Sequence, residues 1–445
     1  MATTPSFPPE VFQARRAEVL RRMRELSPGP SAAVFPATPV ATRNHDVEHP
    51  YRADSDLFWL TGFEEPESVA VLSTDGKPLT LFVRPRDRER EIWNGRRAGI
   101  EGAKAAFGAD QAFTVDELEK ELPALIGSAR TLYYRLGAVD PGFDARIARL
   151  LQTLRMRSRA GTAAPQRIED PGQIVHELRL RKSAEELAAL RKAVELTRKA
   201  HLAAMAAGRP GSHEYELQAL LEREFRGGGG RGWGYYPIVA AGANATVLHY
   251  NDNADPVREG DLVLIDAGAE VDLYTADVTR TFPAAGRFNP AQRAAYSLVL
   301  SAADHAIAAA RTGATLDALH EGAVRILTEG MVKLGLLSGD VDQLIKDSAF
   351  RRYYMHRTSH WLGLDVHDAG NYRGPGGEPR RLEPGMVFTV EPGLYVAPDD
   401  EKAPAELRGL GIRIEDDILI TEAGHENLTA AIPRTVRDVE AATQR

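Results

Sequence analysis

Five side chains that can bind a divalent cation lie in the second half of the sequence, within apolar or glycine-flanked segments: Asp266, Asp277, His360, Glu391 and Glu415. The run from Asp261 to Asp266, which contains Leu-Val-Leu-Ile, is typical of an inner β-strand. A carboxylate withdrawn from water in such a strand has to be paired, protonated or bound to a metal. The sequence therefore indicates that cations neutralise these acids.

Asp277 is expected to face Asp266 across a hairpin. It stands eleven residues later, in the segment Tyr274–Phe282, whose composition is that of a returning strand. Two carboxylates that close would repel each other strongly in a medium of low dielectric constant, unless a divalent ion lay between them. This pair is the first indication of a metal centre.

Glu391 and Glu415 interrupt apolar runs in the same way, in segments 386–393 and 411–420. Four carboxylates with one imidazole form an oxygen-rich ligand set that suits manganese, cobalt or zinc better than copper or an iron–sulfur cluster. Five ligands exceed what one catalytic zinc usually takes, whereas two ions ~3.5–4 Å apart, bridged by carboxylates and a hydroxide, fit the count. A lone acid of this kind is more often a surface charge or half of an ion pair. The conjunction of five ligands favours a dinuclear centre.

The elements that must position these ligands fall into two parts. Segment 31–136 alternates short strand-like runs with helix-like runs, which is an α/β pattern. The stretch 160–172 is rich in residues that break helices and strands, and we predict that it is a linker. The sequence thus predicts an accessory α/β domain over residues 1–172 and a second domain over residues 173–445.

Two long helices are expected in the second domain. Ser183 and Glu186 form a capping box that opens a helix ending near Gly208. The pair Asn289-Pro290 opens another helix, whose apolar residues recur at helical spacing. Such helices should back a curved antiparallel sheet that carries the ligands, so the expected fold class is α+β.

Several spaced segments carry a resemblance to a known family. They are Leu248-His-Tyr250, Asp266-Ala-Gly268, Asp277-Val-Thr-Arg280, His356–His367, Thr389–Tyr395 and Gly411–Asp416, with Thr42–Asp46 and Pro50–Phe63 in the first domain. In this order they resemble the signature segments of the aminopeptidase P family of proline-specific aminopeptidases. The resemblance implies a C-terminal pita-bread domain, similar to creatinase and methionine aminopeptidase, with a smaller N-terminal α/β domain.

The resemblance also implies roles for the five ligands. Asp266 would chelate one ion, Asp277 and Glu415 would bridge, and His360 and Glu391 would complete the other ion. A hydroxide between two divalent ions, most simply manganese with zinc or cobalt as alternatives, would attack the carbonyl that precedes proline. Glu391 would carry a proton to the departing imide nitrogen, which has no N–H of its own.

Three further histidines and one arginine match catalytic positions of that family. His249 would face the bound proline, His367 would donate to the developing oxyanion, and His356 would support the site or handle protons. Arg413 is expected to orient the carboxylate of Glu415 and to balance its charge. Other histidines on expected helices are predicted to be structural or exposed: His201, His213, His305 and His320.

Substrate contacts are implied by the same resemblance. Asp46 would bind the free amino terminus and would reach a neighbouring subunit's cleft, Trp93 would line the pocket, and Tyr235 and Tyr395 would frame the substrate. The expected partners are peptides that begin with Xaa-Pro. Arg357 departs from the pattern, since relatives usually carry glycine after the first histidine of this segment, and this change affects the size of the pocket and the substrate length.

Composition sets wider bounds on the function. The chain has 445 residues and a net charge of -8, with a pI near 5.9, which argues against a nucleic-acid partner. The absence of cysteine excludes disulfides, zinc fingers and thiol nucleophiles. The N-terminus has no leader-like pattern and no ~18 apolar residues run unbroken. We therefore expect a cytoplasmic protein without membrane attachment, assembled as a homo-dimer or homo-tetramer.

Two alternatives stay open at this point. An Xaa-Pro dipeptidase (prolidase) would share the metal ligands but would also bind the C-terminal carboxylate of a dipeptide; the segments in the first domain favour the aminopeptidase. A non-catalytic binding protein on the same fold, as among histone-chaperone and growth-regulator relatives, would lack metal ligands, and so would a creatinase-like enzyme. The complete ligand set disfavours both.

Overall fold

The computed structural model describes residues 6–157 and 163–444. It contains two compact units, Met1–Leu178 and Arg179–Arg445. Helix α7 (Gly172–Arg179) begins where the sequence suggested the end of the first domain, and the division falls near its last residue. The boundary at residue 172 stays a prediction.

No helix among the described residues has the length and apolar character needed to cross a membrane.

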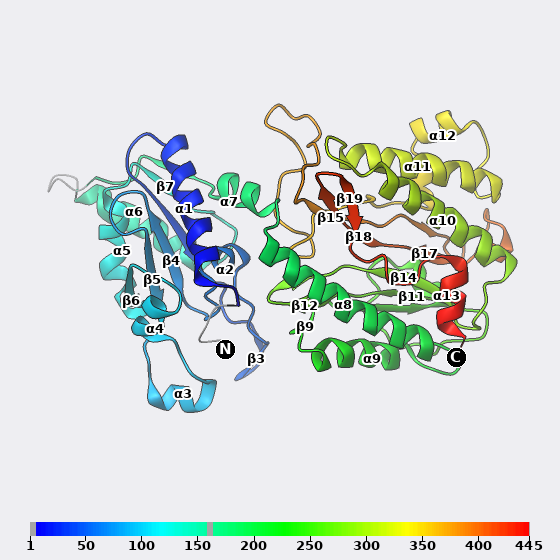
Figure 1. The fold of residues 1–445 in the computed structure, drawn as a ribbon, viewed down its shortest axis with the longest axis horizontal. Helices are drawn as coiled ribbons and strands as arrows, with labels where there is room; N and C mark the ends of the chain where they lie inside the picture. Colours follow the sequence, from blue (N-terminus) through cyan, green and yellow to red (C-terminus); the bar gives the residue numbers. More distant parts are fainter. Residues whose placement is uncertain (1–5, 158–162, 445) are drawn as a thin grey trace. The chain divides into compact units, whose positions relative to one another are not determined.

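The first unit is built on a six-stranded mixed sheet in the order β6-β5-β4-β1-β7-β8 (Figure 1). Strand β1 pairs antiparallel with β4 and parallel with β7. The strands are β1 (Ser31–Pro36), β4 (Val69–Ser73), β5 (Leu79–Val83), β6 (Gln111–Thr114), β7 (Thr131–Tyr133) and β8 (Arg167–Glu169). A separate two-stranded hairpin consists of β2 (Thr42–Asn44) and β3 (Val47–Glu48).

Helices of the first unit pack on this sheet through apolar side chains. Leu122 and Ile126 of α5 and Leu150 and Leu154 of α6 are buried in one cluster with Val34 of β1. The helices are α1 (Pro9–Leu26), α2 (Ser55–Thr61), α3 (Arg88–Asn94), α4 (Gly99–Ala105), the 3-10 turn η1 (Val115–Glu117), α5 (Leu118–Gly127) and α6 (Pro141–Met156). The α/β pattern predicted for this part is therefore present.

The predicted linker at residues 160–172 needs a correction. Residues 158–162 lie outside the described residues, but Arg167–Glu169 form β8, which pairs parallel with β7 in the register Thr131↔Arg167. Most of this segment therefore belongs to the first unit. An edge strand of three residues is too short to show the alternation by which strands are recognised in a sequence.

Long helices of the second unit begin and end as the sequence predicts. The capping box of Ser183 and Glu186 opens α8, and Gly208 ends it; Asn289 caps α10, which begins at Pro290. The helices are α8 (Ala184–Ala207), α9 (Glu214–Gly227), α10 (Pro290–Ala309), α11 (Leu316–Lys333), α12 (Val341–Lys346) and α13 (Val436–Thr443), with 3-10 turns η3 (Gly242–Thr246), η4 (Ala349–Arg352) and η5 (Ala405–Leu407).

In the described part of the second unit, residues 179–444, the strands form four small antiparallel sheets. Their orders are β10-β11-β14, β13-β12-β9, β15-β18-β19 and β16-β17. The strands are β9 (Gly232–Trp233), β10 (Ile238–Ala241), β11 (Leu262–Asp266), β12 (Ala269–Val271), β13 (Tyr274–Thr275), β14 (Thr279–Pro283), β15 (Val387–Val390), β16 (Gly393–Tyr395), β17 (Gly411–Arg413), β18 (Asp416–Thr421) and β19 (Gly424–Asn427).

Breaks between these sheets coincide with acidic residues. Asp266 ends β11 before the chain passes to the sheet of β12, and Asp277 lies between β13 and β14. Glu391 lies between β15 and β16, and Glu415 between β17 and β18. At Gly268 a Cβ atom would lie 1.7 Å from the carbonyl oxygen of Ala276, so glycine is needed where these backbones approach. The chain thus brings its acids together where it changes sheets.

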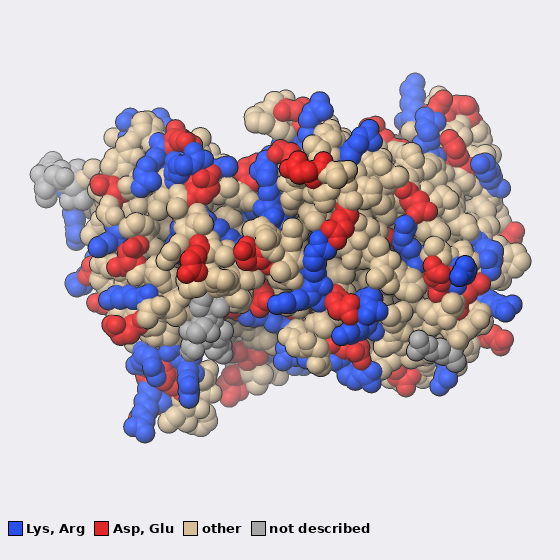
Figure 2. All heavy atoms as spheres, in the orientation of Figure 1, with Lys and Arg blue, Asp and Glu red and all other residues tan. Residues whose placement is uncertain are grey.

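Helices α8, α9, α10 and α11 cover these sheets, and their apolar side chains form the core with those of the strands (Figure 1). Phe225 of α9, Val299 of α10 and Leu327 of α11 are fully buried in one cluster with Phe282 of β14. The strands that carry the acidic residues are therefore packed against a buried apolar core. On the face drawn in Figure 2, basic and acidic side chains are interspersed over the surface.

Candidate metal centre and substrate pocket

All five predicted metal ligands line one pocket of the second unit. Its volume of about 770 Å³ lies within the ~300–1,000 Å³ typical of small-molecule sites. The ligands are Asp266, Asp277, His360, Glu391 and Glu415. The folded chain thus brings together residues that are up to 149 positions apart, from 266 to 415.

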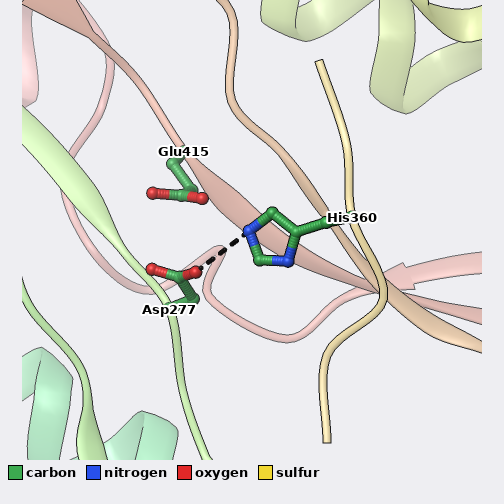
Figure 3. Close-up of side chains that lie close together, drawn as sticks. All are labelled: Asp277, His360 and Glu415. Atoms are coloured by element: carbon green, nitrogen blue, oxygen red, sulfur yellow. Dashed lines mark ion pairs between the residues drawn. The ribbon is translucent and has the colours of Figure 1, made fainter. Parts of the chain in front are cut away.

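Asp277, His360 and Glu415 form the tightest group. One potential ligand atom of each lies within 4.8 Å of those of the other two, and Figure 3 shows the three side chains converging. His360 Nδ1 lies 3.0 Å from the carbonyl oxygen of Trp361 and donates to it, which turns Nε2 toward Asp277 Oδ2, 3.3 Å away. This group has the composition and spacing of a metal site.

Glu391 and Asp266 adjoin this group. Glu391 Oε1 lies 3.7 Å from His360 Nε2. The hydroxyl of Tyr235 is within hydrogen-bonding distance of Asp266 Oδ1 and Asp277 Oδ1, which connects the two acids. The five ligands are therefore contiguous, as the dinuclear hypothesis requires.

So many buried carboxylates in one pocket are electrostatically unfavourable unless cations accompany them. Burial raises the pKa of Asp277, and it raises the pKa of Glu391 to about 7, although the charges of His360 and Arg413 oppose the rise in Glu391. Burial, together with the charges of Asp277 and Glu391, raises the pKa of Glu415 well above its ordinary value. These acids gain from a cation, and their oxygens with one imidazole suit a divalent metal.

His360 responds in the opposite direction. Burial lowers its pKa, but the hydrogen bond and the charge of Asp277 outweigh burial and raise it to about 9. Without a cation, His360 and Asp277 therefore form an ion pair. Metal binding has to displace the proton from Nε2, so the affinity for metal should fall in acid.

Arg413 does not contact Glu415 in the way that the sequence suggested. Its Nη2 donates to Asp266 Oδ2 at 2.6 Å, and its Nε donates to Thr279 Oγ1 at 3.0 Å. The hydroxyl of Thr279 in turn donates to Glu415 Oε2 at 2.7 Å. Arg413 thus neutralises Asp266 directly and reaches Glu415 through Thr279, because the strand breaks between Arg413 and Glu415 and the alternation of side chains is lost.

Two threonines that position ligands were missed in the sequence. Thr279 stands two residues after Asp277, and Thr389 stands two before Glu391. Thr389 Oγ1 accepts from the amide of His360 at 3.2 Å. Residues two apart in an extended chain share a face, and this spacing was the available signal.

The three predicted catalytic histidines also line the pocket. His356 Nε2 lies 2.9 Å from the hydroxyl of Tyr395, and its Nδ1 lies 3.5 Å from Glu391 Oε2. Burial lowers the pKa of His356 to about 4, so it is neutral at pH 7. The His367 ring lies 4.4 Å from that of His360, centroid to centroid, and burial lowers its pKa. His249 is exposed at the pocket surface.

Predicted substrate contacts divide between the two units. Tyr235 lines the pocket, and Tyr395 stands behind it, with its hydroxyl accepting from Arg413 Nη1 at 3.0 Å. Asp46 is exposed in the turn between β2 and β3, and Trp93 on α3 is 86% exposed. The roles of Asp46 and Trp93 stay predictions.

Helix histidines have mainly structural contacts. His201 of α8 is buried and lies 3.1 Å from the carbonyl oxygen of Ala267. His320 of α11 is closer to the site than its helical setting suggested, since its Nδ1 lies 2.8 Å from Thr358 Oγ1. The sequence gives no signal for this contact, because it depends on how α11 packs.

The class of protein follows from comparison of the sequence with family models. Residues 188–422 match metallopeptidase family M24, and residues 12–133 match the aminopeptidase P N-terminal domain. The chain belongs to metallopeptidase family M24. The predicted fold class, a C-terminal pita-bread domain with a smaller N-terminal α/β domain, is confirmed by these matches and by the solved structures below.

Several relatives within this family are named Xaa-Pro aminopeptidase. The chain is 45% identical to Xaa-Pro aminopeptidase of Escherichia coli over 97% of its own length and 96% of that protein. It is similar to Pseudomonas aeruginosa aminopeptidase PepP, with 47% identity, a TM-score of 0.95 and 98% of both chains covered. A zinc-substituted E. coli aminopeptidase P in complex with product gives 45% identity, a TM-score of 0.94 and the same coverage. The findings support a hydrolase of the Xaa-Pro aminopeptidase type over the dipeptidase alternative.

Proposed function

We propose that this chain releases the N-terminal residue from peptides with proline in second position, and that it does so with two divalent ions, manganese first and zinc or cobalt as alternatives. The observation that supports the proposal is the convergence of four carboxylates and His360 Nε2 in one pocket. The positive charges of Arg413 and His360 are two, fewer than the four that full ionisation of these acids would require.

Asp266, Asp277, His360, Glu391 and Glu415 would hold the ions. When bound, a pair of divalent ions supplies a hydroxide near neutral pH and polarises the scissile carbonyl.

Glu391 is suited to carry the proton that the reaction has to move. Its carboxyl group lies within the cluster of ligands, with Oε1 3.7 Å from His360 Nε2, and a carboxylate beside the reacting groups can take up a proton and pass it on. The imide nitrogen of proline has no N–H and leaves only when protonated. His356, 3.5 Å from Glu391 Oε2 and anchored to Tyr395, restricts the orientation of this carboxyl.

His249 and His367 are suited to bind the substrate near the reacting carbonyl. Burial and the charges of His360 and His249 lower the pKa of His367, although the charge of Asp266 opposes them, so its ring donates a single hydrogen bond as a neutral group at pH 7. A fixed donor aimed at a developing oxyanion lowers the barrier, typically by a few kcal/mol. Arg413 fixes Asp266 and limits the negative charge of the pocket.

Recognition of the amino terminus is assigned to Asp46, with Trp93 as a pocket residue and Tyr235 framing the substrate, whereas Tyr395 lies behind the pocket and positions Arg413 and His356. Asp46 and Trp93 belong to the first unit, and the proposal rests for them on the sequence resemblance. A homo-oligomer and a cytoplasmic location also stay predictions.

The test compares three peptides with the manganese-loaded protein: an Xaa-Pro dipeptide, an Xaa-Pro-Yaa tripeptide and an Xaa-Ala-Yaa tripeptide. We expect cleavage of the Xaa-Pro-Yaa tripeptide, with release of the first residue, and a clear preference for it over the other two. A strong preference for the dipeptide would instead identify a prolidase, and equal cleavage of the Ala tripeptide would remove the requirement for proline.

A further inference from the structure

The mouth of the pocket carries charged residues that the reaction does not use. Among its lining residues these are Arg357, Arg373, Arg380 and Asp317. The side chains of Arg357 and Arg373 are 58% and 55% exposed, whereas that of Asp317 is 25% exposed. The metal ligands lie deeper, with Asp277 at 4% exposure. The pocket thus has an acidic floor and a mainly basic mouth.

At the mouth of the pocket, the carboxylate of Asp317 forms ion pairs with two guanidinium groups. Arg357 Nη2 pairs with Asp317 Oδ1, and Arg373 Nη2 lies 2.9 Å from Asp317 Oδ2. Asp317 stands in the first turn of α11, whose N-terminal end favours a negative charge, so this acid is held in place by its helix. The group of three side chains has a net charge of +1.

Arg357 and Arg373 each keep N–H donors for a second acceptor. A guanidinium presents five N–H groups in a planar fork, and the contacts of Arg357 and Arg373 with Asp317 both use Nη2. Arg380 adds a third guanidinium to the wall, and its Nε donates to the carbonyl oxygen of Asn371 at 2.7 Å. Forks of this kind bind carboxylates in a bidentate way more readily than lysine does.

The direction of the substrate places its later residues at this mouth. The bond to be cleaved has to lie at the metal ligands on the floor, and an aminopeptidase removes only the first residue. The chain that follows proline therefore leaves through the open side of the pocket, where Arg357 and Arg373 stand.

We infer that Arg357 and Arg373 form a subsite for a carboxylate in the part of the peptide that follows proline. This inference rests on the proposed function. The carboxylate belongs either to the C-terminus of a short peptide or to an aspartate or glutamate side chain; both present the same pair of oxygens to the two forks. Because the interaction is the same before and after the bond breaks, it changes KM and leaves kcat nearly unchanged.

The experiment uses four peptides that differ only after proline: Ala-Pro-Leu with a free C-terminus, its C-terminal amide, Ala-Pro-Glu amide and Ala-Pro-Gln amide. The first pair tests the terminal carboxylate, and the second pair tests the side-chain carboxylate. We expect kcat/KM of the manganese-loaded protein to be about three- to tenfold higher for the charged member of at least one pair, as for a partly exposed charge pair. Raising the salt concentration should reduce the ratio.

Arg357→Gln and Arg373→Gln should each lower the ratio of kcat/KM between the charged and the neutral peptide of a pair toward one. The change should arise in KM, and cleavage of the neutral peptides should persist. Arg325→Gln is the matched control, since Arg325 lies on α11, the helix that carries Asp317, pairs with Asp342 and has a 53% exposed side chain. The Arg325→Gln variant should show the same ratio of kcat/KM between charged and neutral peptides as the unchanged protein. Calorimetric binding of Pro-Leu and Pro-Leu amide gives a second reading without turnover.

Equal kcat/KM within both peptide pairs, or a ratio that both arginine variants preserve, would overturn the subsite while leaving the proposed function intact. If the neutral peptides are not cleaved by the metal-loaded protein at all, the proposed function fails, and the subsite fails with it.

Discussion

Arg280 and Asp416 form an ion pair with no exposed surface directly behind the metal ligands, with Arg280 Nη2 2.7 Å from Asp416 Oδ1. Arg280 Nη1 also donates to the main-chain carbonyl oxygens of Thr279, at 3.0 Å, and of Glu415. One cation thus ties together the backbone of two segments that carry the site. The placement of Glu415 depends on this buried pair.

Arg280→Met should lower the free energy of unfolding by about 3–5 kcal/mol, because the buried Asp416 keeps the neutral Thr429 hydroxyl at 2.7 Å but its remaining cation, Arg434 Nε, is 3.6 Å away. Urea unfolding of the metal-free protein at pH 7 measures the change. Arg191→Met, which breaks an exposed pair with Glu426, should cost less than about 1 kcal/mol. Equal losses in the two variants would show that the buried pair has no special importance.

Glu391→Ala should abolish turnover and weaken metal retention, because it removes both a ligand and the proton carrier. A loss of at least about 10²–10⁴ in kcat is expected from the proton-transfer role alone. Metal content after dialysis and kcat on an Xaa-Pro-Yaa peptide are the two measurements. Full activity in this variant would contradict the assigned role.

His249→Ala should lower activity while both metals stay bound, since His249 is not among the ligands. A loss of roughly 10- to 100-fold corresponds to the ~1.5–3 kcal/mol of one hydrogen bond to a charged group. The loop itself should persist: Glu214 accepts from the neighbouring Tyr250 hydroxyl at 2.9 Å and from the Ala241 amide at 2.7 Å. A variant that lost its metals would place His249 among the ligands instead.

His201 should make the stability of the protein depend on pH. Burial lowers its pKa from 6.5 to about 4 in the folded state. A histidine whose folded pKa is depressed contributes stability above pH 6.5, and this contribution is lost as the pH falls from about 6.5 to about 4, because only the unfolded chain takes up the proton. The shift corresponds to roughly 3 kcal/mol.

The check is urea unfolding at pH 7 and pH 4.5 for the unchanged protein and for His201→Gln, whose amide can still donate to the carbonyl oxygen of Ala267. Between these pH values the unchanged protein should lose more stability than the variant, by a large part of that amount. Parallel losses in both proteins would mean that His201 titrates normally in the fold.

Local signals in the sequence were sufficient for much of this fold and site. The capping box at Ser183 and the Asn289-Pro290 pair locate helix starts, because caps depend only on adjacent residues. The ligands were recognisable because an acid such as Asp266 at the end of an apolar strand is costly without a cation. At such positions the apolar sequence pattern itself indicates that the acid is buried.

Contacts set by tertiary packing were not predictable in this way. Arg413 pairs with Asp266 and not with Glu415, since the break before β18 abolishes the alternation on which the expectation was based. The meeting of Arg357 and Arg373 at Asp317 depends on how a loop folds over the first turn of α11. No spacing in the chain encodes either relationship.

The most direct test of the dinuclear centre is a titration of chelator-treated protein with manganese, in which bound metal and cleavage of an Xaa-Pro-Yaa peptide are measured together. We predict negligible activity without metal and a rise that saturates when two equivalents are bound per chain. Saturation at one equivalent would contradict a centre of two ions. Full activity in protein demonstrably free of divalent metal would contradict the metal centre altogether.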